Sequence, residues 1–207
     1  KYLSFYRSVQ RLKHTNGVVD RYQDDLLEYS ELRNAIIHDH TQAHYTIAEP
    51  HDDVVERIEE IELALTKPKL VIPAFLKELR TVEGKDTVKD VLKVIRETSF
   101  SQFPVYQNQQ FVGLLTDKGI IHWLAQNTND SVDALLETTV FDLIRDDERA
   151  QNYQFISRKT TIYQAEDIYL KQLKQNKRLD ALLITEHGNQ DEGLIGMVTT
   201  NDLIEIP

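Results

Sequence analysis

A threonine and an aspartate near the carboxyl end of the chain have the types and spacing needed to hold a phosphorylated sugar. Thr199 ends an expected strand, and Asp202 lies in the first turn of an expected helix. Free backbone N–H groups at a helix start favour a phosphate, and the Asp202 carboxylate can accept hydrogen bonds from both hydroxyls of a ribose. The plainer alternative is a capping box, in which these two side chains satisfy backbone donors of the helix start.

A second group of candidate residues lies in the expected helices near the amino terminus. Asn34 and His38 are four residues apart and share one helix face, whereas Arg33 lies five residues from His38. Histidine can act as a general acid or base near neutral pH, and arginine can stabilise phosphoryl charge. The alternative is a helix-end histidine favoured by the dipole and an arginine paired with nearby acids. We favour none of them as catalytic residues.

Several histidines and aspartates also gather in one short window of the chain. Their spacing matches no closed structural metal site, and polar loops between helices often collect such residues. We therefore predict no metal ligand. The residues are His38, Asp39, His40, His44, His51, Asp52 and Asp53.

Composition limits the classes of protein to which the chain can belong. The 207 residues are 41% hydrophobic, enough to bury a core, and the absence of cysteine excludes disulfides and zinc–thiolate sites. That absence fits a reducing cytoplasm, where we expect the protein to act. The sequence has neither a signal peptide nor an apolar run long enough to span a membrane. Because Met197 is the only methionine, we expect the chain to be part of a longer protein.

The charge distribution argues against a general nucleic-acid binder. The formal net charge is -10, whereas neutralising phosphates requires a basic surface. Residues 1–19 contain basic side chains and no acid, and residues 20–66 are strongly acidic. We interpret this asymmetry as two solvated helix faces, and a polyanion-binding face is the alternative.

Apolar residues recur at helical spacing through residues 1–66, which predicts three helices. The Asn16-Gly17 pair separates the first helix from the second, and the third begins near Pro50. Such helices can bury their apolar stripes only against each other or against a second subunit. A proline-punctuated linker is expected at residues 67–78.

Beyond the linker, the sequence predicts the same order of elements twice. A strand, a helix, two strands and a further helix are expected in residues 79–128 and again in residues 151–207, with a connection at residues 129–150. Residues 113–116 (Gly-Leu-Leu-Thr) match residues 196–199 (Gly-Met-Val-Thr), which indicates an internal repeat. The expected fold class is α+β, with a helical bundle followed by two β-α-β-β-α repeats.

Four segments of this duplicated pattern resemble the CBS (cystathionine-beta-synthase) domain, which usually occurs as a tandem pair. The resemblance covers roughly residues 70–207. It implies that the repeats pack as a pseudo-twofold pair with clefts between them, often occupied by AMP, ATP or another adenosyl compound. The four segments are Asp86-Thr87-Val88, Phe103-Pro104-Val105, Val112-Gly113-Leu114-Leu115-Thr116 and Ile195-Gly196-Met197-Val198-Thr199-Thr200-Asn201-Asp202.

The resemblance implies that a ligand in such a cleft contacts both repeats. Thr199 and Asp202 of the second repeat would face the segment before Pro104, notably Phe100 and Ser101. Adenine would lie between apolar backbone segments of the two repeats. The candidate ligands are AMP, ADP, ATP and S-adenosylmethionine, and no cofactor is required.

The first repeat departs from the family pattern at the corresponding point. Thr116, a further candidate ligand contact, is followed by Asp117, Lys118 and Gly119, so that glycine stands where the ribose-binding acid belongs. We therefore predict one competent cleft, at Asp202, and one degenerate cleft. Because the chain ends soon after Asp202, we expect the last helix to be very short or missing.

The segment from Leu32 to His38 resembles the Arg-x4-His motif of HEPN helical domains, in its Arg-Asn form. In active members of that family, the motif forms a metal-independent RNA-cleaving site at a dimer cleft. The family motif often has tyrosine two places after the histidine, where this chain has His40. The resemblance implies that Arg33 and Asn34 would act with His38 if the site cleaves RNA.

These observations predict a regulatory protein rather than an enzyme. The CBS pair would bind an adenine-containing ligand, and the helical domain would transmit the change within a homodimer to an unidentified protein partner. One alternative is a HEPN-type ribonuclease gated by the CBS pair, with RNA as a partner. The other is an interaction scaffold whose clefts bind no ligand.

Overall fold

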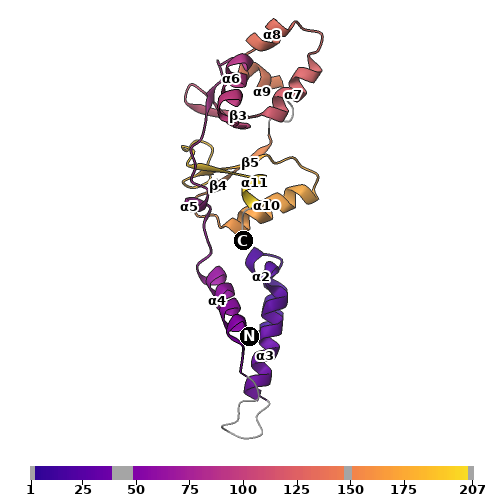
Figure 1. The fold of residues 1–207 in the computed structure, drawn as a ribbon, viewed down its shortest axis with the longest axis vertical. Coiled ribbons are helices and arrows are strands. Elements are labelled where there is room, and N and C mark those ends of the chain that lie inside the picture. The colour runs from indigo at the N-terminus through magenta and orange to yellow at the C-terminus, as the bar shows by residue number, and fades with distance from the viewer. Residues whose placement is uncertain (1–2, 39–48, 147–150, 205–207) are drawn as a thin grey trace. The chain divides into compact units, whose positions relative to one another are not determined.

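The computed structural model describes residues 3–38, 49–146 and 151–204. The chain divides into two compact units. Figure 1 shows both units and labels many of their helices and strands. The first unit is residues 1–69 with 161–167, and the second is residues 70–160 with 168–207.

The first unit is mainly helical and has a small apolar core. The sequence predicts three helices here, but the second is divided at Tyr22 into α2 and α3. Asn16 sets the start of α2, because its side-chain oxygen accepts hydrogen bonds from the N–H groups of Val18 and Val19 at 3.0 and 3.2 Å. The helices are α1 (Phe5–Leu12), α2 (Gly17–Arg21), α3 (Gln23–His38) and α4 (Asp52–Thr66). The buried core side chains are Val9, Val19, Leu26 and Ile61.

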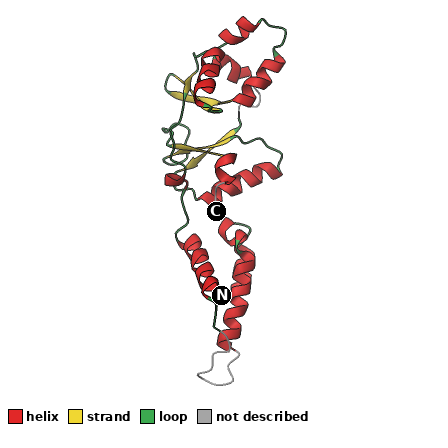
Figure 2. Cartoon of the chain, viewed as in Figure 1, coloured by secondary structure: helices red, strands yellow, loops and turns green. Residues whose placement is uncertain are grey.

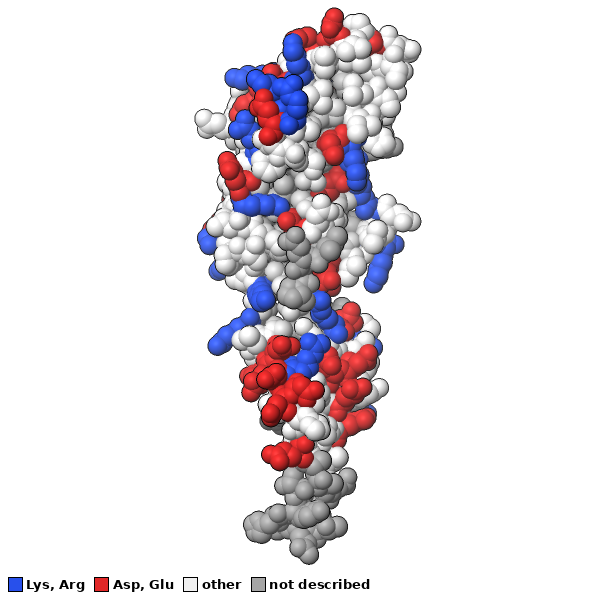
Figure 3. Space-filling view, in the orientation of Figure 1, with Lys and Arg blue, Asp and Glu red and all other residues white. Residues whose placement is uncertain are grey.

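Acidic side chains gather on the surface of the helical unit, as Figure 3 shows. Both α3 and α4 begin with paired acids, Asp24 with Asp25 and Asp52 with Asp53, where the helix dipole favours negative charge. A surface of this sign repels a phosphate backbone.

The first repeat of the second unit is a three-stranded sheet with two helices. Strand β1 pairs with β2 in parallel, and β2 pairs with β3 in antiparallel fashion. The Thr87 hydroxyl and the Asp90 carboxylate form a capping box that fixes the start of α6. The elements are β1 (Val82–Glu83), α6 (Val88–Thr98), β2 (Gln102–Gln107), β3 (Gln110–Thr116) and α7 (Asp117–Gln126).

The second repeat has the same strand order and pairing, with β4 parallel to β5 and β5 antiparallel to β6. Gly113 lies opposite Val105 in the first sheet, and Gly196 lies opposite Ile184 in the second. The segments that match in sequence thus occupy equivalent places in the two sheets. The elements are β4 (Tyr153–Ser157), α10 (Ile162–Lys174), β5 (Ala181–Thr185), β6 (Gly196–Thr199) and the short α11 (Thr200–Ile204).

A short helix that precedes the first repeat packs against the second repeat. Helix α5 (Val71–Ala74) lies within the expected linker, yet Val71 is completely buried. The Val71 N–H donates a hydrogen bond to the Thr160 carbonyl oxygen at 2.9 Å. A Cβ added at Gly196 would lie 2.7 Å from the Phe75 carbonyl oxygen, so the chain after α5 lies directly against β6.

The helix that precedes the second repeat packs in the reverse direction, against the first. The Val140 N–H donates to the Asp86 carbonyl oxygen at 2.8 Å, and a Cβ added at Gly113 would lie 3.0 Å from Ile144. Val140 and Ile144 are buried four residues apart, a helical spacing that the expectation of a plain connection at residues 129–150 overlooked. The connection contains α8 (Val132–Glu137) and α9 (Val140–Asp146).

The two sheets share an apolar core, and Figure 2 shows their strands between the helices of the two repeats. Phe111 of β3 packs edge-on against Tyr153 and Phe155 of β4, with ring centroids 5.0 and 5.2 Å apart. This packing makes each sheet part of the other's core. The buried members are Phe111, Leu114, Ala181, Leu183 and Met197.

We expect Gly196→Ala to destabilise the second unit by about 1–3 kcal/mol, because overpacking forces the backbone near Phe75 to shift. Chemical denaturation would measure the change. Gly193→Ala is the matched control, since a Cβ at Gly193 meets nothing within 4 Å. Equal stability of the two variants would contradict the tight approach of the α5 segment to β6.

Candidate functional site

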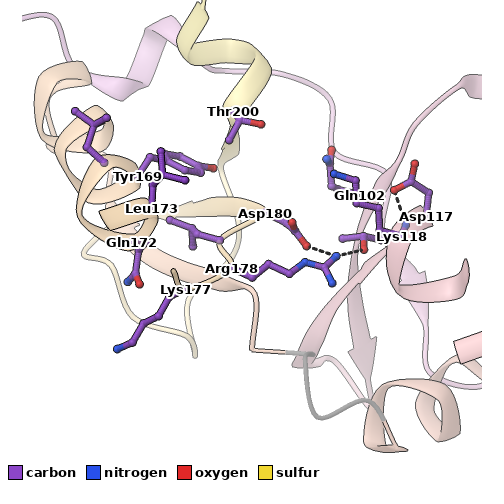
Figure 4. Close-up of a pocket in the computed structure, with 13 residues that line it drawn as sticks. Gln102, Asp117, Lys118, Tyr169, Gln172, Leu173, Lys177, Arg178, Asp180 and Thr200 are labelled. Atoms are coloured by element: carbon purple, nitrogen blue, oxygen red, sulfur yellow. Dashed lines mark hydrogen bonds and ion pairs between the residues drawn. The ribbon is translucent and has the colours of Figure 1, made fainter. Parts of the chain in front are cut away.

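A cavity of about 360 Å³ lies where residues of the two repeats meet within the second unit. Its volume falls within the range of small-molecule sites, about 300–1,000 Å³. The first repeat lines it with the end of β3 and the start of α7. The second repeat contributes part of α10, residues 177–180 before β5, and Thr200 at the start of α11. Figure 4 shows these side chains around the cavity.

Arg178 connects the two repeats through this cavity. Its guanidinium donates a hydrogen bond to the Thr116 Oγ1 of the first repeat at 3.2 Å and forms an ion pair with Asp180 at 2.7 Å. Figure 4 marks both interactions. The Thr116 hydroxyl oxygen also accepts a hydrogen bond from the Gly119 N–H at 2.9 Å, which caps α7. The polar end of the first repeat is thus joined directly to a cation of the second.

Asp180 is held firmly on the other side of this bridge. Its carboxylate accepts a hydrogen bond from the Asn152 side-chain amide at 2.5 Å, and its backbone N–H donates to the Asn152 carbonyl oxygen at 2.6 Å. The Asp180 side chain is only 16% exposed, which strengthens its interaction with Arg178 relative to a surface ion pair. Asp180 therefore fixes the position of the Arg178 guanidinium.

Cationic groups outnumber carboxylates on the cavity lining. Lys118, Lys177 and Arg178 line it together with the carboxylates of Asp117 and Asp180. The Asp117 carboxylate accepts a hydrogen bond from the Lys118 N–H at 2.6 Å, at the start of α7. A negatively charged ligand would complement this lining.

Tyr169 contributes a neutral wall to the cavity. Its hydroxyl donates a hydrogen bond to the Val198 carbonyl oxygen at 2.7 Å. Burial, reinforced by the nearby charges of Asp202 and Asp180, raises the pKa of Tyr169 far above neutral pH. The ring therefore offers apolar surface rather than charge.

The cavity draws on only one of the five residues predicted to contact a ligand. Thr116 lines it, whereas Thr199, Asp202, Phe100 and Ser101 are not among its described lining residues. The Ser101 carbonyl oxygen instead accepts a hydrogen bond at 3.0 Å from the N–H of Asp117, the first residue of α7. The cavity thus lies at the cleft that the sequence predicts to be degenerate.

Strand register explains which residues the sequence analysis overlooked. Gln102 pairs with Thr116, and Ala181 pairs with Thr199, so Asp180 occupies in the second repeat the place of Ser101 in the first. An alignment of the two repeats would therefore have pointed to the residues before β5. It would not have revealed the side-chain bridge, which depends on packing between repeats.

Asp202 is engaged by a lysine from the segment before the first repeat. The Lys77 ammonium lies 2.8 and 3.1 Å from its two carboxylate oxygens. The Thr199 N–H and hydroxyl donate to the same carboxylate at 2.6 and 2.7 Å, which is one half of the capping alternative. Burial would raise the pKa of Asp202, but hydrogen bonds from Lys77 and Thr199 outweigh it and lower the pKa below its usual range.

In the helical unit, the structure describes only part of the predicted RNA-cleaving motif. Arg33 and Asn34 lie on α3, and the Arg33 guanidinium donates a hydrogen bond to the Asn34 side-chain oxygen at 3.1 Å. The side chain of His38, like Asp39, His40 and His44, lies outside the described residues. The catalytic role of this motif stays a prediction.

Neither a metal cluster nor a membrane-spanning helix occurs in the part of the chain that the structure describes. The described residues contain no group of three or more histidines, aspartates and glutamates placed to hold a metal ion. None of the described helices combines the length and the apolar character that crossing a bilayer requires.

Residues 74–126 match the family model of the CBS domain. The CBS domain of a CBS domain-containing membrane protein from Sphaerobacter thermophilus is similar in structure, with a TM-score of 0.52 at 14% identity over 74% of this chain and 98% of that one. A CBS domain protein of unknown function from Thermoplasma acidophilum gives a TM-score of 0.51 at 18% identity, over 68% of this chain and 70% of that one.

A third solved structure, the CBS domain of a bacterial CNNM/CorC family Mg²⁺ transporter in complex with ATP, has a TM-score of 0.50 at 18% identity. The match covers 73% of this chain and 94% of that one. No curated protein matches the sequence. The family model and these folds support a CBS domain pair. They do not confirm the HEPN resemblance of the amino-terminal helices.

We expect Asp202 to make stability depend on pH in the acidic range. Because folding lowers its pKa below the usual value of about 3.9, its contribution is complete above that value and is lost as pH falls through the lower folded pKa. Asp202→Asn should therefore be less stable than the parent at about pH 7, and the difference should shrink toward about pH 3. Denaturation across this range would measure it.

The exposed Asp191→Asn is the control for this experiment, and Lys77→Met, which removes the partner, should reproduce the trend of Asp202→Asn. A deficit for Asp202→Asn that stays constant across the pH range would refute the assigned hydrogen bonds.

Proposed function

We propose that this chain is a regulatory protein whose CBS pair binds an adenine nucleotide or another adenosyl ligand between its repeats. The observation that carries the proposal is the cavity of about 360 Å³, which residues of both repeats line and Arg178 crosses. A CBS domain of the same fold has been solved with ATP, which supports the choice of ligand class. A ligand that touches both repeats favours one arrangement of them over another and shifts the population toward it.

The lining residues suit the parts of such a ligand. Leu173, Leu179 and the Tyr169 ring offer apolar surface for adenine, and the Gln102 amide can exchange hydrogen bonds with the edge of the base. The cations beside the start of α7 suit a phosphate or another anionic group. These roles follow from the chemistry of the groups and define where substitutions should act.

A second ligand contact is proposed at Asp202 and Thr199, opposite Phe100 and Ser101. Lys77 already donates to both oxygens of the Asp202 carboxylate, and the Thr199 hydroxyl donates to one of them. A ribose would have to compete with the Lys77 ammonium for these oxygens. Asp202 would thus bind more weakly than a free carboxylate in the same place, because displacement of Lys77 adds a cost.

The output is proposed to pass through the acidic helical unit, in a cytoplasmic homodimer. The chain passes between the two units after Lys69 and again on either side of residues 161–167, and these crossings are the covalent routes by which a change in the pair would reach the helices. The lack of cysteine in the chain supports a reducing compartment.

The first test is thermal melting of the protein with AMP, ADP, ATP or S-adenosylmethionine, each at about 1 mM. A ligand with a Kd of about 10 μM should stabilise the native state by about 2.7 kcal/mol, a shift of several degrees. Thr200→Trp, which places an indole at the cavity lining, should abolish the shift. The control is Thr128→Trp, in an exposed turn after α7.

An unchanged melting temperature with all four compounds would overturn the ligand-binding proposal. A shift that persists in Thr200→Trp and in Thr128→Trp alike would place the ligand outside this cavity.

A further inference from the structure

We propose that Arg178 makes the cavity selective for phosphorylated ligands, by exchanging its bond to Thr116 for bonds to a ligand phosphate. The inference rests on the proposed function and deepens it. It assigns both the ligand chemistry and the contact between repeats that the ligand replaces.

The first step of the argument is that Arg178 is held where it can be recruited. One hydrogen bond of 3.2 Å joins its guanidinium to Thr116, and an ion pair of 2.7 Å joins it to Asp180. A guanidinium has five N–H donors in a planar fork, which matches two oxygens of one phosphate. Arg178 can therefore take a phosphate as an additional, bidentate partner while Asp180 continues to fix its position.

The second step is that releasing Thr116 leaves little unsatisfied. The Thr116 hydroxyl oxygen keeps its hydrogen bond from the Gly119 N–H at 2.9 Å, so the cap of α7 survives the loss of Arg178. Asp180 likewise keeps its hydrogen bond from Asn152. The exchange therefore replaces one hydrogen bond from the guanidinium to a neutral hydroxyl with two to a charged phosphate.

The third step concerns which ligands gain from this exchange. Lys118 and Lys177 also line the cavity. Gly119 stands at the position that corresponds to Asp202 in the second repeat, so the first repeat has no carboxylate there. Each added phosphate thus meets three cationic groups against two carboxylates, Asp117 and Asp180, of which Asp180 is already paired with Arg178. S-adenosylmethionine carries no phosphate, and its one carboxylate is accompanied by an ammonium and a sulfonium cation, so it gains less from Arg178 than a nucleotide does. The expected order of affinity is ATP and ADP, then AMP, then adenosine and S-adenosylmethionine.

The fourth step is the consequence for the fold. Arg178 lies immediately before β5 of the second repeat, and Thr116 lies at the junction of β3 and α7 in the first. When the phosphate replaces Thr116, a direct bridge between repeats becomes a bridge through the ligand. The geometry between repeats then depends on whether a phosphate is present, and a neutral adenosyl compound leaves the direct bridge in place.

The test is calorimetric titration of the full chain with ATP, AMP, adenosine and S-adenosylmethionine, in the parent and in Arg178→Gln. We expect Arg178→Gln to weaken ATP binding by about ten- to a hundredfold and to leave adenosine binding unchanged, since only phosphate contacts are lost. Arg158→Gln is the matched control. Arg158 lies in the same repeat and pairs with Glu186 at 3.0 Å, and neither residue lines the cavity.

Arg178→Lys keeps the charge but not the planar fork, so it should lose less affinity for ATP than Arg178→Gln, again with adenosine unchanged. This variant carries the test if Arg178→Gln does not fold. Equal losses for ATP and adenosine, or tighter binding of adenosine or S-adenosylmethionine than of ATP by the parent, would overturn the role of Arg178 and leave the proposed function intact. Failure of all four compounds to bind the parent would overturn the proposed function itself.

Discussion

The second unit depends on one constraint: each of its two small sheets has an apolar face that residues of the opposite repeat must cover. Helices α6 and α7 help to bury one face of the first sheet, in a core that includes Val91, Phe103 and Ile120, but Phe111 and Leu114 belong to the core shared with the second sheet. Phe111 of one sheet is therefore packed between Tyr153 and Phe155 of the other. The exchange of α5 and α9 reinforces this dependence, because each helix precedes one repeat and packs on the glycine-containing strand of the other, at Gly196 or Gly113.

The cavity follows from the same arrangement. Apolar packing joins the repeats along the strands, but near the ends of the strands the chain must turn into helices, and polar backbone groups and charged side chains replace the apolar ones. Thr116 ends β3 and caps α7, and Arg178 and Asp180 lead into β5. The region where the repeats part is thus polar, partly closed and lined from both sides. A ligand bound there would contact both polar ends at once, and its affinity would therefore depend on the separation of the repeats.

Local patterns in the sequence were sufficient to predict most elements of this unit but not its site. The two copies of the motif are visible in the sequence as short strands, hairpin turns and Gly-x-x-Thr segments. These features depend on interactions between residues that are close together in the chain. Helix α9 carries the same kind of signal in Val140 and Ile144, so its omission was avoidable. The polar bonds of the clefts are different, since Arg178 and Thr116 are 62 positions apart and Lys77 and Asp202 are 125 apart. Such pairs exist only once the repeats have packed, and no periodicity encodes them.

The two clefts also show how a duplicated backbone comes to offer different chemistry on its two sides. In the cleft at Thr116, glycine replaces the acid and a cation, Arg178, enters from the opposite repeat. In the cleft at Asp202, the acid is present but Lys77 is bonded to it. The first arrangement would suit a phosphate, whereas in the second a sugar hydroxyl would compete with Lys77 for the Asp202 carboxylate. The glycine at residue 119 therefore leaves the cleft in which the cations gather without an acid that would repel phosphate.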